Sequence, residues 1–257
     1  MKIRIAIATH KKYWMPKDAC YLPVQAGAEG KESLGYQGDN TGEHISHKNS
    51  HFCELTVLYW LWKNVNADYY GLAHYRRHFI AGKRNLRGSK AVLSEKQWKK
   101  LFAKTDIVLP KKRRYYIESL YSHYEHTHYK RDLEAARNIL KDFYPEYVKA
   151  FDATLQKTSG HMFNMFVMKK EIFQEYCEWL FSILFELEKR IDVSEYDEFQ
   201  ARVFGRISEL LFNVWLERKA YEYLEVPISF LGKIDWVRKI FSFLKAKFFN
   251  IKYNKSF

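Results

Sequence analysis

The stretch Asp68-Tyr-Tyr-Gly-Leu-Ala-His-Tyr-Arg-Arg77 is uncharged and mostly apolar from Tyr69 to Ala73 and ends in His74-Tyr-Arg-Arg77. It predicts a central buried strand whose far end turns polar. Lys2 to Thr9, followed by His10-Lys11, and Asp106 to Pro110, followed by Lys111 to Arg114, have the same form. In α/β sheets, ligands bind beyond the carboxyl ends of the strands, so these three ends predict the ligand site.

Long helical patterns separate the strands. Two more strands are predicted at 161–168 and 224–228, and helices at 52–64, 118–151, 170–187 and 196–218. Strands alternating with helices predict an α/β fold, a Rossmann-type, mostly parallel mixed sheet with helices on both faces, in a single domain over residues 1–232. Residues 26–51 are rich in Gly, Asn, Ser and His and predict a long functional loop.

The composition describes a folded protein that attracts phosphate. Hydrophobic residues make up 47% of the 257 residues, and the formal net charge of +13 favours nucleic acid, anionic lipid or a nucleotide as partner. No run of eighteen apolar residues is present to span a bilayer. Three cysteines without a CxxC pair predict reduced, buried thiols in a cytoplasmic protein.

The segment 233–257 forms a basic tail. From Trp236 onward it carries six basic residues and no acidic ones, and its apolar residues fall on one broad face of a helical wheel. This pattern predicts an amphipathic helix that holds the protein peripherally on the anionic inner face of the plasma membrane. The alternative is a terminal helix that packs on the domain.

Five stretches carry a family resemblance: Ala8-Thr-His-Lys11, Gly38-Asp-Asn-Thr-Gly42, Asp68 to Arg77, His161-Met-Phe-Asn-Met-Phe-Val-Met168 and Gln200-Ala-Arg-Val-Phe-Gly205. In this order and spacing, the chain from about residue 3 to 230 resembles the DUF4422 family of bacterial capsule and exopolysaccharide glycosyltransferases. The resemblance implies a GT-A-like fold and transfer of a sugar from a UDP-sugar donor to a glycan or lipid-linked acceptor. Some members are associated with galactofuranose. His44 stands where family members usually carry Asn.

The predicted donor site lies at the end of the central strand. GT-A enzymes commonly place an Asp-x-Asp there for Mn²⁺ or Mg²⁺, whereas this chain has His74-Tyr75-Arg76-Arg77. Two guanidiniums bind a diphosphate by charge-assisted hydrogen bonds, which predicts a donor site that needs no metal cofactor. A site with Mn²⁺ or Mg²⁺ remains the alternative, as does an ion pair of either arginine with a carboxylate.

The nucleoside is expected near the end of the first strand. Thr9, His10 and Lys11 stand where nucleotide-binding α/β folds place the base and ribose. Asp39 and Asn40, between glycines, are further candidates for donor contacts, with an Asx turn as the alternative.

An inverting transferase needs a general base. Asp197 is the first candidate and Glu198 the second, because they open the helix that follows the acceptor side; an acidic helix cap is the alternative. His161, Asn164 and Arg202 are expected to contact the acceptor. Glu209 lies seven residues after Arg202 on the same helical face, so the two could form part of the pocket wall or a buried ion pair; for Glu209 we expect the structural role. The spacing of His123, His126 and His128 matches no standard metal site.

A nucleic-acid-binding module without catalysis is the competing class, because basic runs with aromatic residues suit single strands. The basic residues are instead scattered over loops and one tail, and no nucleic-acid-binding signature is present. We therefore expect no nucleic-acid partner. A purely structural scaffold would have no reason to line its strand ends with polar groups.

Overall fold

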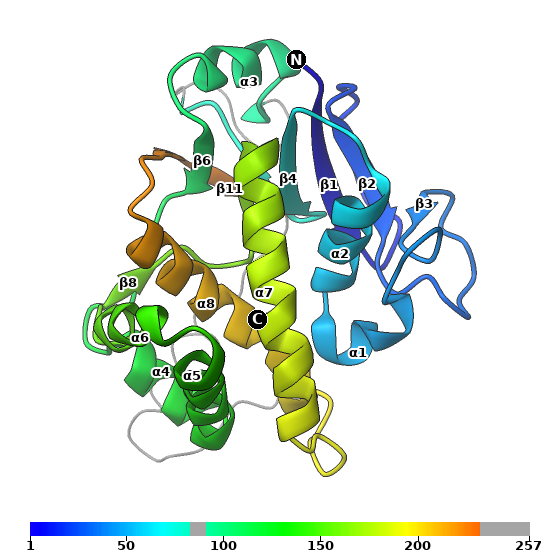
Figure 1. The fold of residues 1–257 in the computed structure, drawn as a ribbon. Helices are drawn as coiled ribbons and strands as arrows, with labels where there is room; N and C mark the ends of the chain where they lie inside the picture. The colour runs from blue at the N-terminus through cyan, green and yellow to red at the C-terminus, as the bar shows by residue number, and fades with distance from the viewer. Residues whose placement is uncertain (83–90, 232–257) are drawn as a thin grey trace.

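The computed structural model describes residues 1–82 and 91–231. They form an α/β fold around a mixed sheet with the strand order β10-β6-β9-β4-β1-β2-β3 (Figure 1). Only β9 runs antiparallel to its neighbours in this order, so the mostly parallel sheet is confirmed. The strands are β1 (Ile3–Thr9), β2 (Tyr21–Gln25), β3 (Gln37–Gly38), β4 (Tyr69–His74), β6 (Ile107–Pro110), β9 (Phe166–Lys169) and β10 (Leu224–Val226).

Two smaller strand pairs lie at the carboxyl edge of this sheet, one as its extension and one as a separate sheet. β5 (Arg77–Phe79) folds back from β4 and pairs with β11 (Ile228–Phe230). A separate two-stranded sheet joins β7 (Arg113–Arg114) to β8 (Ser159–Gly160). Both pairs stand beside the ends of β4 and β6, where the sequence predicts the ligand site.

The helices gather around a long central one, α7 (Figure 1). They are α1 (Asn49–Phe52), α2 (Leu55–Asn64), α3 (Glu95–Phe102), α4 (Leu120–Thr127), α5 (Lys130–Phe143), α6 (Val148–Leu155), α7 (Lys170–Arg190) and α8 (Val203–Lys219). Short 3₁₀ turns are η1 (Ser46–Lys48), η3 (Pro145–Tyr147) and η4 (Gln200–Arg202). The four-helix group α4, α5, α6 and α8 lies on one side of α7, and α1 and α2 lie on the other (Figure 1).

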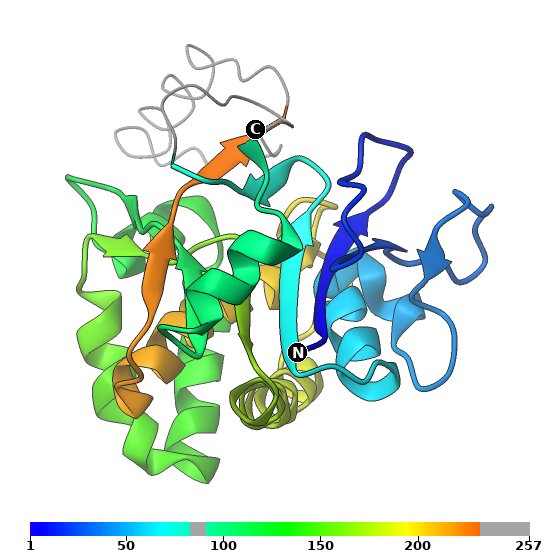
Figure 2. The same ribbon diagram turned by 90° about the horizontal axis from the view of Figure 1, so that it is seen from above.

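Alternation along the strands divides the core into two layers. On β1, Ile3, Ile5 and Ile7 pack against α3 residues, whereas Ala6 and Ala8 face the layer of α2, α7 and α8. Successive side chains of a strand point to opposite faces, so both faces of the sheet are buried under helices. Figure 2 shows β1 and β4 side by side in the middle of the molecule.

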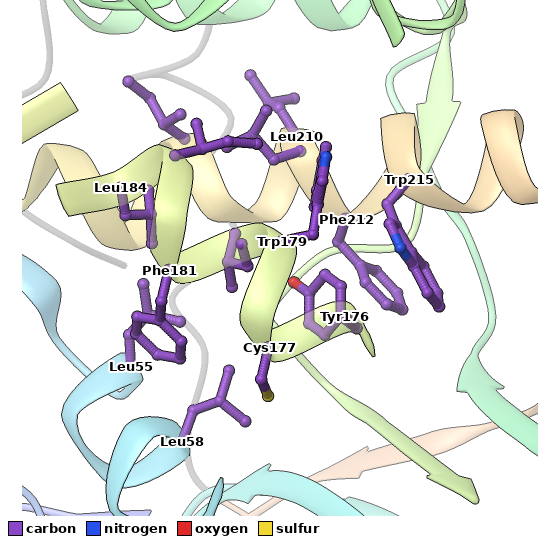
Figure 3. Close-up of a cluster of buried hydrophobic side chains, with 14 of the residues drawn as sticks. Leu55, Leu58, Tyr176, Cys177, Trp179, Phe181, Leu184, Leu210, Phe212 and Trp215 are labelled. Atoms are coloured by element: carbon purple, nitrogen blue, oxygen red, sulfur yellow. The ribbon is translucent and has the colours of Figure 1, made fainter. Parts of the chain in front are cut away.

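Aromatic packing under α7 holds the larger layer together. Tyr176, Phe212 and Trp215 lie together in Figure 3, with ring centroids of Tyr176 5.2 Å from Phe212 and 5.1 Å from Trp215. These fully buried rings fix α8 against α7. The angle of α8 matters below, because its first turns border the site.

Gly71 allows β4 and β9 to approach closely. A Cβ at this position would lie 2.7 Å from Val167 Cγ2 and 2.8 Å from the Phe166 carbonyl oxygen. Because β9 runs antiparallel, its first residue lies at the edge where β1, β4 and β6 end. The loop that precedes β9 therefore joins the ligand edge.

Several sequence predictions need correction in detail. The strand predicted at 161–168 begins only at Phe166, because Phe163 and Asn164 have positive φ angles of 77° and 50°, which no strand accommodates. The strand β2 was not predicted. The helix predicted at 52–64 breaks at Cys53, where φ is 54°. The predicted tail, 233–257, lies outside the described residues, so the division at residue 232 stays a prediction. Within the described residues, no helix is long and apolar enough to cross a membrane.

Candidate functional site

A cavity of about 960 Å³ opens at the carboxyl edge of the sheet. Its walls come from the ends of β1 and β4, from the turn before α2, from the loop before β9, from β7 and α4, and from the first turns of α8. All three polar strand ends predicted from the sequence contribute to this edge, although Lys111 and Lys112 lie outside the lining. The ligand site is therefore expected in this cavity.

One side of the cavity is a cluster of cations. Lys31, Arg76 and Arg202 line it, and the imidazole of His10 lies among them. Burial, reinforced by the neighbouring charges of Lys11, Arg76, Arg202 and Lys31, lowers the pKa of His10. The imidazole is thus kept neutral by a field that attracts anions.

Arg76 offers an unused donor. Its Nε–H is buried and has no hydrogen-bond acceptor among residues 1–82 and 91–231. The guanidinium lies 5.2 Å from the ring centroid of Tyr75 and 5.4 Å from that of Phe230, which hold it in place. A buried donor without a partner costs free energy. The residue as a whole is half-buried and lines the cavity, so its guanidinium can meet an anionic ligand there.

Arg77 is held by aromatic rings as well. Its guanidinium lies 4.3 Å from the ring centroid of Phe163, and burial lowers its pKa. His74 fixes the same loop, because its Nε2–H donates to the Phe163 carbonyl oxygen over 2.5 Å. Burial also lowers the pKa of His74, which favours the neutral imidazole that this bond uses.

Two carboxylates, Glu54 and Glu209, line the cavity beside these arginines. Burial, and next the charge of Glu54, raises the pKa of Glu209 to about 7. Asn164 orients Glu54, because its Nδ2 donates to Glu54 Oε1 over 2.7 Å and to the Gly205 carbonyl oxygen over 2.9 Å. Ser208 Oγ in turn donates to Asn164 Oδ1 over 2.8 Å.

The backbone around the two carboxylates is strained. Cys53, Phe163 and Asn164 have positive φ angles of 54°, 77° and 50°, although none is glycine. Such conformations cost about 1–3 kcal/mol each and persist where the surroundings impose them, often at active sites. In this protein, the three strained residues place Glu54 and the Phe163 backbone at the cavity wall. The Phe163 backbone forms a hydrogen bond with Glu209.

Another part of the cavity wall combines aromatic rings with arginines. The Arg206 guanidinium lies 3.8 Å from the ring centroid of Phe199, and burial followed by the charge of Arg202 lowers its pKa to about 10. The Arg113 guanidinium lies 4.8 Å from the ring centroid of Tyr115. Stacked rings and fixed cations of this kind suit a sugar that carries anionic groups.

The cavity collects most of the predicted site residues. Those that line it are Thr9, His10, His74, Tyr75, Arg76, Arg77, Glu198 and Arg202. Lys11 lies next to it, with Nζ 5.5 Å from the ring centroid of Tyr75. Asn40 is exposed outside it.

Asp39 has a structural environment. It is fully buried and accepts four hydrogen bonds: from the Gly27 and Ala28 backbone N–H groups over 2.8 and 2.9 Å, from Ser46 Oγ over 2.5 Å and from Thr56 Oγ1 over 2.6 Å. The prediction of a donor contact therefore has no support in the geometry. The four bonds do not form an Asx turn either, since the partners of Asp39 lie 7 to 17 residues away; Asp39 instead ties separate loop segments together.

His161 is turned away from the cavity. Its Nδ1–H donates to the Pro110 carbonyl oxygen over 2.8 Å, and burial lowers its pKa to about 4, so it is a neutral core residue. Asn164 is also buried, but it touches Glu54 and so acts on the site indirectly. Neither residue is placed to contact an acceptor directly.

Asp197 caps a helical turn. Its Oδ1 accepts a hydrogen bond from the Gln200 backbone N–H over 2.7 Å, and it does not line the cavity. This geometry matches the acidic cap that was the alternative to a catalytic base. Glu198, the second candidate, lines the cavity but is exposed to solvent.

Sequence reasoning predicted only part of the role of this helical face: it named Arg202 for the acceptor, expected Glu209 to be structural and did not name Arg206. Arg202, Arg206 and Glu209 are the only residues from 202 to 216 that are not buried, and all three line the cavity. Their spacing of four and then three residues places them on one helical face. Three charges in one stripe of an otherwise apolar helix were the available signal. Glu54 and Lys31 also line the cavity, but no sequence pattern around them indicated a role in the site.

A possible metal-binding group lies elsewhere. In the described ranges, the only set of three or more His, Cys, Asp or Glu ligands close enough to share an ion is Glu29, His44 and His47, within 4.8 Å of one another. None of the three lines the cavity. His123 and His126 instead bind Glu118, with Nδ1 to carboxylate distances of 3.0 and 2.9 Å.

The fold is glycosyltransferase-like. A solved structure of the WbbM bifunctional glycosyltransferase in its apo form matches with a TM-score of 0.80 and 35% sequence identity, over 91% of this chain and 46% of that one. This chain thus spans about half of that protein. Residues 4–220 match the family described as a domain of unknown function, DUF4422. The chain belongs to this family, as the sequence motifs indicated. Comparison with curated proteins finds no match.

Proposed function

We propose that the chain is a glycosyltransferase that moves a sugar from a UDP-sugar to a glycan or lipid-linked acceptor in surface polysaccharide synthesis. The observation that carries the proposal is the pair of ring-supported guanidiniums, Arg76 and Arg77, that line a cationic cavity at the carboxyl ends of β1 and β4. Such a site suits a diphosphate, since guanidinium groups bind phosphate oxygens in a fixed fork. The glycosyltransferase-like fold supports the same class of reaction.

In the proposed complex, the donor diphosphate lies against Arg76 and Arg77, with Lys31 and Arg202 adding positive charge. The nucleoside extends toward Thr9 and His10 at the end of β1. When the bond between the sugar and the diphosphate breaks, negative charge grows on the leaving oxygen, and the two arginines stabilise it. The acceptor enters along the aromatic wall of Tyr115 and Phe199, and the transfer inverts the anomeric carbon. Galactofuranose as the sugar rests on the family resemblance alone.

Ligand binding tests this proposal. We expect UDP to raise the melting temperature more than UMP does, because the second phosphate completes the contact with the arginines. A short oligonucleotide is expected to give no comparable shift. A stronger shift with the oligonucleotide would favour the nucleic-acid module instead. Release of UDP from a panel of UDP-sugars, including UDP-galactofuranose, identifies the sugar.

Turnover is expected to survive EDTA. The end of β4 carries guanidinium groups where a metal-dependent enzyme would place a carboxylate pair, so the leaving group is neutralised by protein charge. UDP release should therefore be equal after dialysis against EDTA and after addition of Mn²⁺. Loss of turnover in EDTA with recovery in Mn²⁺ would contradict the prediction.

The basic tail is proposed to dock on an anionic membrane near a lipid-linked acceptor. Each basic residue near such a surface adds about 1 kcal/mol of attraction. Liposome flotation tests this proposal. At low salt, we expect the full chain to float with anionic vesicles, whereas a chain that ends at Asp235 should not float with them. Equal behaviour of the two would assign the tail to packing on the domain.

A further inference from the structure

We infer that Glu209 is the general base that accepts the proton of the acceptor hydroxyl, and that Glu54 and Asn164 are positioning residues for it. The inference rests on the proposed function and adds the group that activates the acceptor. It differs from the prediction for Asp197, whose carboxylate is engaged in capping the Gln200 backbone N–H.

The first argument is the direction in which Glu209 points. α8 is buried on nearly all sides from Val203 to Leu216, and its aromatic residues are locked against α7. Only the stripe of Arg202, Arg206 and Glu209 escapes burial, and this stripe faces the cavity. A carboxylate on a rigid helix is held at a fixed place, as proton transfer to a bound substrate requires.

The second argument is the environment of the carboxylate. Glu209 has the charges of Glu54, Arg77 and Arg113 around it and a hydrogen bond from the Phe163 backbone. Burial disfavours the charged form of Glu209, and two neighbouring carboxylates also resist simultaneous ionisation. The pKa of Glu209 is therefore about 7, so its carboxyl keeps its proton up to about neutral pH. A proton acceptor with this pKa suits catalysis near neutral pH.

The third argument is the support around the pair. Asn164 ties Glu54 to the Gly205 carbonyl of α8, and Ser208 ties Asn164 to the same helix. Asn164 reaches this position only through its positive φ. These bonds thus fix three segments to one another around Glu209: the strained loop before β9, the turn before α2 and the helix α8. A carboxylate with only a packing role would not need such a frame.

The proposed step balances in atoms and charge. The acceptor oxygen forms a bond to the anomeric carbon of the sugar, and its proton passes to the Glu209 carboxylate. The bond between the anomeric carbon and the β-phosphate oxygen breaks, and its electron pair leaves on UDP, next to Arg76 and Arg77. Glu209 then releases the proton to water, which restores the ionised form.

The pH dependence follows from the ionised form being active. Turnover is expected to rise about tenfold per pH unit below the pKa of Glu209, which is about 7, and to level off above it. Burial lowers the pKa of His74, so its titration lies on the acidic side of this range. The charged groups that act on Glu209 from the surrounding elements are Glu54, Arg77, Arg113, Arg202 and Arg206, and His74 lies beside Glu54 and Arg77.

The test is Glu209→Gln in the full chain. We expect turnover of the UDP-sugar to fall by about 10²- to 10⁴-fold, with the melting-temperature shift by UDP unchanged. The residual activity should lose its rise near pH 7. Glu209→Asp, which keeps the carboxylate one methylene further back, should recover part of the rate. Glu217→Gln, an exposed position on the same helix, should leave the rate unchanged.

Stability gives an independent measurement. A carboxyl whose pKa is raised in the folded state stabilises the fold at acid pH, and this contribution is lost as the pH rises through about 7. Glu209→Gln, which stays neutral, should therefore melt higher than the wild type at pH 8 and at the same temperature near pH 4. The inference is overturned if Glu209→Gln keeps normal turnover, or if Asp197→Asn abolishes turnover and Glu209→Gln does not. Absence of turnover in the wild type with every UDP-sugar would instead count against the proposed function.

Discussion

Arg76→Ala is expected to lower the kcat of sugar transfer at least ~100-fold, the scale of removing one donor that stabilises developing charge. The buried Nε–H of Arg76 has no acceptor among the described residues, and its guanidinium is held between Tyr75 and Phe230. In the proposed complex, this group meets the leaving diphosphate. Charge on the leaving oxygen grows most in the transition state, so the loss should fall on kcat more than on KM.

Two further variants sharpen this measurement. Arg76→Lys keeps the charge but loses the planar fork, so an intermediate rate is expected. Arg137→Ala serves as the control, because it removes an exposed guanidinium of α5 that pairs with Asp152 of α6 and lies outside the cavity lining. It should leave kcat unchanged. If Arg76→Ala raised KM and left kcat untouched, Arg76 would bind substrate and transition state equally. The role of leaving-group stabiliser would then be wrong.

Asp39→Ala is expected to destabilise the fold by about 3–5 kcal/mol, because it leaves buried N–H and hydroxyl donors that cost about 1–3 kcal/mol each without a partner. Asp39 joins the loop after β2 to η1 and α2 through its four hydrogen bonds. For a chain of this length, the melting temperature should fall by about 8–15 °C. Thermal unfolding followed by circular dichroism measures the change.

Asn40→Ala is the matched comparison for Asp39→Ala. Asn40 is the exposed neighbour of Asp39, so its truncation should change the free energy of unfolding by less than ~0.5 kcal/mol. If Asp39 instead contacted the donor, Asp39→Ala would weaken UDP binding and leave the melting temperature of the free protein unchanged. That outcome would restore the sequence prediction.

Hydrophobic periodicity predicted the main strands and helices because it reports which faces are buried. β1, β4 and β6 are mostly apolar runs that end in or are followed by polar residues, and the structure places their carboxyl ends at the ligand edge. β2 escaped prediction because it is short and contains Pro23, which is uncommon inside strands. The early end of the strand predicted at 161–168 depends on the φ angles of Phe163 and Asn164, which tertiary contacts impose.

The site was predicted where chemistry follows strand ends and missed where it depends on helix packing. Arg76 and Arg77 follow directly from the end of β4. Glu209 and Asp197 sit close in sequence, and only the orientation of α8 shows that the first lines the cavity and the second caps a turn. Asp39 shows the converse error: a polar residue in a glycine-rich loop looked accessible but is enclosed by four donors.

The late position of the antiparallel strand β9 in the sequence has a consequence for folding during synthesis on the ribosome. β1, β2 and β4 lie within the first 74 residues and pair with one another, but the other edge of β4 bonds to β9, which begins at Phe166. At a synthesis rate of 5–20 residues per second, the backbone groups on that edge of β4 stay unpaired for roughly 5–20 s before β9 is made. A nascent chain in this interval exposes a strand edge that invites pairing with other chains, so we expect its yield in cells to depend on chaperones that shield β4.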